Sequence, residues 1–276
     1  MSNFRALNIA ATGMSAQQKR VDTAANNLAN SNTPGFKKSI AEFNELPYQT
    51  ERVAGMGDRS EGEYYSQGIQ YGTGVGIGAT SINFAPGEGL ERSKESLSLQ
   101  INDNTGNNFF VINLPNDEKA YTRNGQFTLD NEGRITTTEG YIVDPEVKIP
   151  VENMKDPVQI NKEGRVLIKL VGDKDADPAT ELGRINLVKF INPQGLEQVG
   201  SSLFKATNAS GEAIEGNAGE GDFAGVKISQ GYLEASNTNS LTTMTDLIKA
   251  QQVYSMNSKV IQTSEKMLDD IVRIKG

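Results

Sequence analysis

The chain has 276 residues and a formal net charge of −8, with 27 lysines and arginines against 35 aspartates and glutamates. This acidic balance disfavours nucleic-acid binding, and we expect no nucleic-acid partner. Cysteine and histidine are absent, which excludes disulfides, thiolate and imidazole catalysis, and zinc sites built from these residues. We therefore expect no metal and no cofactor.

The N-terminal sequence MSNFRALNIAATGMSAQQKR mixes apolar and polar residues and lacks the basic-then-apolar order of a secretory signal. If the protein leaves the cytoplasm, we expect a route other than general secretion. No apolar run reaches the roughly 18 residues of a membrane span, so we also expect no membrane insertion.

Residues 3–30 carry an apolar repeat whose spacings alternate between three and four residues. This period of about 3.5 is typical of a coiled-coil seam, which is narrower than the stripe of an ordinary amphipathic helix. We expect one helix, roughly 40 Å long at ~1.5 Å per residue, that ends before Pro34 and Gly35. The seam positions are Phe4, Leu7, Ala11, Met14, Gln18, Val21, Ala25 and Leu28.

Residues 240–275 contain neither glycine nor proline, and they repeat the seam pattern of the N-terminus. The polar residues 236–239 offer several N-caps for a second long helix, which we expect here. Its seam positions are Val253, Met256, Val260, Thr263, Met267, Ile271 and Ile274, and an earlier stripe slightly out of register is Leu241, Met244, Leu247 and Ile248.

The middle of the chain alternates turn signals with short β-rich runs. Asn124-Gly125 predicts a two-residue hairpin, and further turns are expected at 131–133, 139–140, 162–164 and 193–195. We expect an α+β protein, with long N- and C-terminal coiled-coil helices and a central all-β domain built as an antiparallel barrel or sandwich. The expected parts are a helix and turn motif (1–36), an extended linker with an exposed polar loop at 49–67 (37–85), the β domain (86–232) and the C-terminal helix (233–276).

Glycines alternate with larger residues in the segment YGTGVGIGAT. The spacing Gly74-x-Gly76-x-x-Ala79 also fits a loose dinucleotide fingerprint, but the following SINFAPGEG is no helix, which argues against nucleotide binding. We expect instead an extended strand with one bare face, which another backbone approaches closely. The glycines of that face are Gly72, Gly74, Gly76 and Gly78.

Paired carboxylates occur in polar helix or loop contexts, which favours solvated surface charge over catalysis. They are Asp269-Asp270, Glu61 with Glu63, and Asp173 with Asp175. The sequence DKDADP from Asp173 lacks the glycine and glutamate of a calcium loop, so it predicts a turn.

The two end helices could pair inside a monomer. Burying about seven apolar side chains gains roughly 10–20 kcal/mol, whereas ordering 28 residues costs on the order of 1–2 kcal/mol each. These sums favour helices that become ordered when several chains supply the missing apolar surface.

The segment NNLANSNTPGFKK, from Asn26 to Lys38, resembles the signature of the flagellar axial proteins, which are the rod, hook and hook-associated subunits of the bacterial flagellum. The segment GYLEASNTNSLTTMTDLIKAQQVYSMNSKVIQTSEKML resembles the closing segment of that family. Four stretches are similar to the distal rod type of that family: GIQYGTGVGI, AYTRNGQFTLDNEG, VKFINPQGLEQVGSSLF and QGYLEASN. The family's usual GxGFF stands here as DNTGNNFFV, with Asn107 and Asn108 before the phenylalanines.

The resemblance implies a subunit exported unfolded by the flagellar export apparatus, whose disordered ends become coiled-coil layers of a hollow tube with the β domain outside. The tube would be a drive shaft that crosses the periplasm. Implied partners are further copies in a helical homo-oligomer, other axial proteins (proximal rod, hook) and surrounding ring proteins. The implied motif residues are Asn26, Asn27, Leu28, Asn30, Thr33, Gly35, Phe36, Ser236, Asn237, Asn257, Ser258 and Lys259.

Two other functions stay open from the sequence. The chain could be another axial subunit, from the proximal rod or the hook. More remotely, it could be a carboxylate-dependent glycan hydrolase of the cell envelope, although no constellation of residues favours that chemistry.

Overall fold

The computed structural model describes residues 2–55, 67–87, 89–103, 105–115, 118–150, 157–169 and 180–275. The chain is α+β and divides into two compact units, each described here by itself. Unit 1 holds the described parts of 1–28, 39–81 and 240–276, and unit 2 holds those of 29–38 and 82–239. Expectations for Glu61, Glu63, the Asp173 segment and the centre of the 49–67 loop lie outside the described residues.

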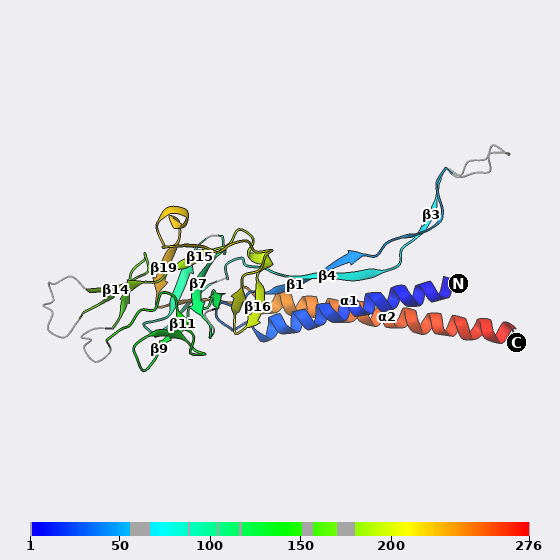
Figure 1. Cartoon of the computed structure of the whole chain (residues 1–276). Coiled ribbons are helices and arrows are strands. Elements are labelled where there is room, and N and C mark those ends of the chain that lie inside the picture. Colours follow the sequence, from blue (N-terminus) through cyan, green and yellow to red (C-terminus); the bar gives the residue numbers. More distant parts are fainter. Residues whose placement is uncertain are drawn as a thin grey trace. The chain divides into compact units, whose positions relative to one another are not determined.

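Two long helices dominate unit 1, and their bounds follow the apolar periodicity closely. Helix α1 spans Ser2–Ala29 and helix α2 spans Ser240–Lys275 (Figure 1). None of the described helices is long and apolar enough to cross a membrane.

Two two-stranded sheets complete unit 1 (Figure 1). Strands β1 and β4 pair with each other, and β2 pairs antiparallel with β3. The described start of the predicted 49–67 loop therefore forms β2, and its described end lies directly before β3. The bounds are β1 Ser39–Glu45, β2 Gln49–Arg52, β3 Ile69–Tyr71 and β4 Val75–Ile82.

Unit 2 is built around a nine-stranded sheet in the order β16-β17-β8-β7-β11-β10-β9, with β15 joining β7 to β18. A three-stranded sheet, β12-β13-β14, and the pairs β19-β6 and β20-β5 accompany it. The bounds are β5 Leu90–Arg92, β6 Leu99–Asn102, β7 Asn108–Asn113, β8 Lys119–Thr122, β9 Phe127–Leu129, β10 Ile135–Thr137, β11 Ile142–Val143, β12 Gln159–Ile160, β13 Arg165–Ile168, β14 Thr180–Arg184, β15 Leu187–Lys189, β16 Glu197–Gly200, β17 Leu203–Lys205, β18 Ile214–Gly216, β19 Lys227–Gln230 and β20 Tyr232–Glu234, with 3-10 turns at Pro193–Gly195 and Gly221–Phe223.

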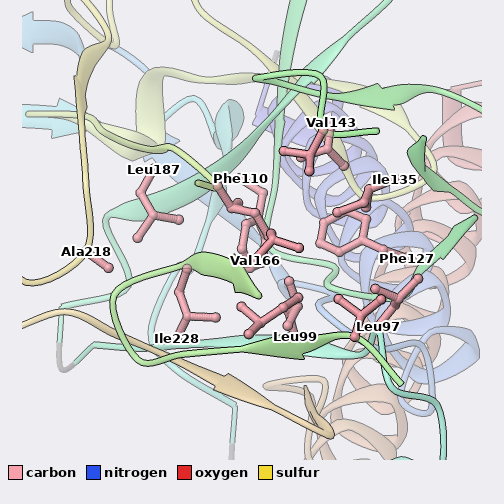
Figure 2. Close-up of a cluster of buried hydrophobic side chains, with 14 of the residues drawn as sticks. Leu97, Leu99, Phe110, Phe127, Ile135, Val143, Val166, Leu187, Ala218 and Ile228 are labelled. Atoms are coloured by element: carbon pink, nitrogen blue, oxygen red, sulfur yellow. The ribbon is translucent and has the colours of Figure 1, made fainter. Parts of the chain in front are cut away.

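The path of the nine-stranded sheet ends at β16 and β9, so the described strands form open sheets and no closed barrel. Strand β7 lies at the centre and is buried on both faces, which explains its continuous apolar run. Phe110 joins a core cluster with Leu99 and Val166, drawn in Figure 2, whereas Phe109 joins a second cluster on the other face. These clusters fix the strands that position the charged residues described below.

The hairpin predicted at Asn124-Gly125 is wrong. Strand β8 pairs with β7 and β17, and β9 pairs with β10, so the dipeptide connects strands that are not partners. A Cβ at Gly125 would overlap the Leu99 carbonyl oxygen, and the Gly125 oxygen accepts a hydrogen bond from the Leu99 N–H at 3.0 Å. The glycine is thus explained by close backbone approach, which a local turn signal does not distinguish from a hairpin.

The turns at 131–133, 139–140 and 162–164 are confirmed, because each connects two paired antiparallel strands. The segment 193–195 is a 3-10 turn that connects β15 to β16.

The glycine-alternating segment is only partly a strand. Residues 72–74 lie between β3 and β4, and Gly74 has φ +117°, so the predicted continuous strand is wrong there. A Cβ at Gly74 would overlap Thr12 Oγ1 of α1, whereas one at Gly76 would lie 3.2 Å from Leu46 Cδ2. The nearest neighbours of the bare positions within the chain are therefore mostly side chains. Close packing of these glycines between chains stays a prediction.

Replacing Gly74 by valine is expected to lower the melting temperature of the chain clearly more than replacing Gly76. The Gly74 change adds a strained backbone to an overlap with helix α1, and together these cost at least about 2 kcal/mol. The Gly76 change costs about 1 kcal/mol, because the Leu46 side chain can shift. Equal melting temperatures for the two variants would show that Thr12 moves away freely.

Candidate assembly interface

Helices α1 and α2 lie against each other in antiparallel order through small or polar side chains. Gly13 of α1 faces Asn257 of α2, because a Cβ at Gly13 would lie 2.7 Å from Asn257 Nδ2. Further along, both helices line a groove of about 270 Å³ formed by Gln18, Val21, Asp22, Gln251 and Tyr254. The buried side chains of the helices are Ala10, Ala16, Thr23, Ala24, Asn27, Ala250 and Ser264. Small residues at a helix contact let the two backbones approach closely.

The predicted seam of α2 lies away from these buried residues. Its large apolar side chains remain exposed, between 45 % for Val260 and 86 % for Ile274, while Val253 is half-buried. Met244 and Ile248 of the earlier stripe are each 54 % exposed. Such a long row of exposed apolar side chains marks an interaction surface. The exposed members are Leu241, Met244, Ile248, Met256, Val260, Met267, Ile271 and Ile274.

The seam of α1 is placed differently. Leu7, Met14, Val21 and Leu28 are half-buried, whereas the smaller or polar seam members Ala11, Gln18 and Ala25 are exposed. The side chain of Phe4 lies outside the described residues. The single chain therefore leaves the apolar seam of α1 incompletely covered, and its role in assembly stays a prediction.

The asparagine motif after α1 provides hydrogen bonds within the chain. The Asn27 side chain bonds the main chain of Ser39 in both directions, with Nδ2 donating to the oxygen at 2.7 Å and Oδ1 accepting from the N–H at 2.9 Å. Asn30 Oδ1 accepts from Thr33 Oγ1 at 3.2 Å. Asn26 has interactions of its own.

The second family segment is tied to the first through Asn237, inside unit 2. Asn237 Oδ1 accepts from the Lys38 N–H at 2.7 Å, and its Nδ2 donates to the Asn83 and Ala85 oxygens at 2.7 and 3.0 Å. Ser236 is buried, and its hydroxyl accepts from the Thr238 N–H. On α2, Ser258 is half-buried and Lys259 is exposed.

Four buried charges meet in unit 2, and we call them the charge cluster: Lys37, Asp103, Arg123 and Glu234. Arg123 is 1 % exposed and binds both carboxylates, with Nε donating to Glu234 Oε2 at 2.8 Å and Nη2 to Asp103 Oδ1 at 3.0 Å. Its Nη1 donates to the Asn108 carbonyl at 2.7 Å. Lys37 Nζ donates to Glu234 Oε1 at 2.7 Å and to the Ala85 oxygen at 2.8 Å. Two positive and two negative charges are thereby paired away from water.

Burial and pairing act in opposite directions on the two carboxylates of the charge cluster. Burial raises the pKa of Glu234, but Arg123 and Lys37 outweigh it and hold that pKa below its usual range. Burial likewise raises the pKa of Asp103, and Arg123 and Asn108 reverse the shift. Burial lowers the pKa of the Lys37 ammonium, against the opposing effect of Glu234.

The charge cluster predicts a loss of stability in acid. Carboxyls whose pKa is depressed by folding stabilise the protein above their ordinary pKa of about 4, and that stability is lost as the pH falls through the lower folded values. Urea unfolding should therefore give a constant free energy from pH 7 to about pH 5 and a decline below about pH 4. The Glu234→Gln variant should decline less steeply, because one of the two carboxyls is gone; an identical slope would contradict this assignment.

The charge cluster is not among the residues predicted from the sequence. Lys37, Arg123 and Glu234 each lie inside a segment that resembles the family, next to the glycines, asparagines and aromatics that carry the resemblance. For Glu234, the available signal was a single charge in the otherwise uncharged stretch GYLEASNTNS. Among the described residues, no group of three or more carboxylates forms a metal site.

Three models of flagellar protein families match the chain, and together they define its class. The model described as "Flagella basal body rod protein" matches residues 7–37, and the "Flagellar hook protein FlgE/F/G D1 domain" matches 105–168. The "Flagellar basal body rod FlgEFG protein C-terminal" model matches 229–274. The chain thus has the segments of flagellar rod and hook subunits.

Relatives over the whole length narrow the class to one family. Three proteins named "Flagellar basal-body rod protein FlgG" are similar: 43 % identical in Caulobacter vibrioides (99 % of this chain, 100 % of the relative), 42 % in Borreliella burgdorferi (96 % of both) and 34 % in Bacillus subtilis (99 % of both). The chain belongs to the FlgG family of flagellar basal-body rod proteins. It is a structural protein of the flagellar basal body.

Proposed function

We propose that the chain is a subunit of the distal rod that polymerises into a hollow tube and transmits motor torque across the periplasm to the hook. Membership of the FlgG family supports the place in the rod. The observation that carries polymerisation is the row of apolar side chains left exposed on α2 in the single chain.

In this proposal the two end helices form the coiled-coil layers of the tube, and unit 2 forms the outer β domain. The contacting partners are further copies of the chain, the proximal rod and hook proteins at its ends, and the surrounding ring proteins. The export apparatus delivers the unfolded subunit. The chain carries out no catalysis, in keeping with a structural family.

The energetics support a helix pair that gains most of its order on assembly. Each large apolar side chain contributes about 1.5–3 kcal/mol when fully buried, and the exposed members of the α2 row forgo much of that in the monomer. The helix contact within the chain is made largely of small residues, which bury little apolar area.

Hydrogen exchange tests this coupling between order and assembly. In the purified monomer, the amides of residues 1–30 and 240–276 should exchange far faster than those of β7, whereas in the polymer they should be protected. Slow exchange of these residues in the monomer would show that the intrachain helix pair is stable alone, and assembly-coupled ordering would be rejected.

The place of the subunit is tested by imaging purified basal bodies by cryo-electron microscopy. We expect the chain in the distal rod, and its presence in the proximal rod or hook would support the other axial function. Release of soluble fragments from peptidoglycan by the purified chain would instead support a glycan hydrolase, and we expect none.

A further inference from the structure

Two connectors of the chain meet within unit 2. The N-terminal connector, residues 29–38, begins at the last residue of α1, and the C-terminal connector, residues 232–239, precedes α2. They are joined by main-chain hydrogen bonds from the Gly35 N–H to the Glu234 oxygen at 2.8 Å and from the Asn237 N–H to the Phe36 oxygen at 3.4 Å. Two segments almost 200 residues apart are thus direct neighbours.

Two side chains of the C-terminal connector also bind the N-terminal connector. Glu234 accepts from Lys37 Nζ, and Asn237 accepts from the Lys38 N–H. The N-terminal connector also bonds main-chain groups of residues 83 and 85, and Asn237 binds the oxygens of both. Without the C-terminal connector, the N-terminal one would lose the bonds of the Gly35 N–H, the Phe36 oxygen, the Lys38 N–H and the Lys37 ammonium to that segment.

The buried position of Lys37 also depends on the negative charge of Glu234. The Lys37 side chain has no exposed surface, and Glu234 is its ion-pair partner among the described residues. Arg123, which directly follows β8, donates to Oε2 of the same carboxylate, and the Gly87 N–H lies 3.3 Å from Oε1. An ammonium in this place without Glu234 would be a buried, unpaired charge beside a guanidinium, which is strongly unfavourable.

The main chain of the N-terminal connector also packs closely against the segment that contains Arg123. Gly35 has φ +69°, and a Cβ there would lie 2.6 Å from the main chain of Asn124, next to Arg123. Lys37, Arg123 and Glu234 come from the three separate segments that match the family models, one from each. The contact therefore forms only when all three segments are folded together.

We propose that Lys37, Arg123 and Glu234 act as an interlock: the N-terminal connector takes its position in unit 2 only after the C-terminal connector has bound the sheets of that unit. Because a chain is synthesised from its N-terminus, residues 29–38 cannot take this position before residue 234 has been added. An incomplete chain keeps Lys37 exposed to water, and only a complete subunit holds both connectors in fixed, neighbouring positions. The interlock does not depend on the place of the subunit in the flagellum.

Amine acetylation of the folded full-length chain, followed by mass spectrometry, tests the interlock. Lys37 and Lys38 are adjacent and provide a matched pair, because Lys37 is fully buried and Lys38 is only half-buried. In the unmodified sequence, Lys37 should react at least about 100-fold more slowly than Lys38. In Glu234→Gln, the Lys37 rate should rise by roughly 100-fold, while the exchange protection of the Val111 amide in β7 stays in place.

Unchanged labelling of Lys37 in Glu234→Gln would overturn the interlock, since the N-terminal connector would then be held independently. If that variant loses protection in β7 as well, Asn237→Ala replaces it, because it removes the hydrogen bond from the Lys38 N–H to the Asn237 side chain without leaving a charge unpaired. Asn237→Ala should raise the Lys37 rate about tenfold and release the amides of 36–38. No change at Lys37 in Asn237→Ala would likewise reject the proposal.

Discussion

Replacing Arg123 by methionine is expected to lower the free energy of unfolding of unit 2 by about 3–5 kcal/mol. The substitution keeps much of the side-chain volume but leaves Asp103 and Glu234 buried, with Lys37 as the remaining cation of the charge cluster. A domain of ordinary stability, about 5–15 kcal/mol, would lose a large share of it. Urea unfolding followed by tyrosine fluorescence measures the loss.

Two further variants separate charge pairing from general effects of losing an arginine. Arg165→Met removes an arginine whose ion pairs with Glu163 and Glu181 lie at the surface, and it should cost at most about 1 kcal/mol. Arg123→Lys keeps the charge but loses the planar fork that binds Asp103 and Glu234 together, so it should recover only part of the stability. A loss below about 1 kcal/mol in Arg123→Met would contradict the importance of the cluster.

The periodicity of the sequence predicted both helices well. Residues 3–30 and 240–275 were expected, and Ser2–Ala29 and Ser240–Lys275 are found, because long apolar repeats without an internal proline leave few alternatives. The same periodicity did not reveal which face is covered within the chain. That face is made of alanine, glycine and short polar residues, which carry almost no hydrophobic signal.

Local turn signals succeeded where strand partners are neighbours in sequence and failed where they are not. The turn at 131–133 connects β9 and β10, which pair with each other. The strand before Asn124-Gly125, β8, instead pairs with β17, about 80 residues away. No local sequence pattern predicts such a distant partner. The outcome there is decided by packing around β7 and the close approach of Leu99.

The charge cluster could not be predicted for a related reason. A lysine, an arginine or a glutamate in a polar segment is normally at the surface. Here Glu234 is 111 residues from Arg123 and 197 from Lys37, and only the fold brings their charges together. The family resemblance pointed to the right segments, but it identified them by asparagines and glycines rather than by these ions.

Replacing Val260 by aspartate is expected to abolish polymerisation while leaving the single chain intact. Val260 is 45 % exposed in the exposed row of α2, so a carboxylate there stays hydrated in the monomer. If the row is covered in the assembled rod, the same carboxylate becomes buried without a partner, which costs several kcal/mol per subunit. The critical concentration for polymerisation should rise roughly 100-fold or more, and cells carrying the variant should not swim.

Gln262→Asp is the matched control, because it places the same charge two residues away on α2, at an exposed polar position outside the apolar row. It should polymerise and support swimming nearly as well as the unmodified chain. Leu28→Asp extends the test to the seam of α1, where the half-buried position predicts the same loss of assembly with a modest loss of monomer stability. Polymerisation of Val260→Asp at the normal concentration would show that this row faces water in the rod, and the covered surface would then have to lie on another face of the helix pair.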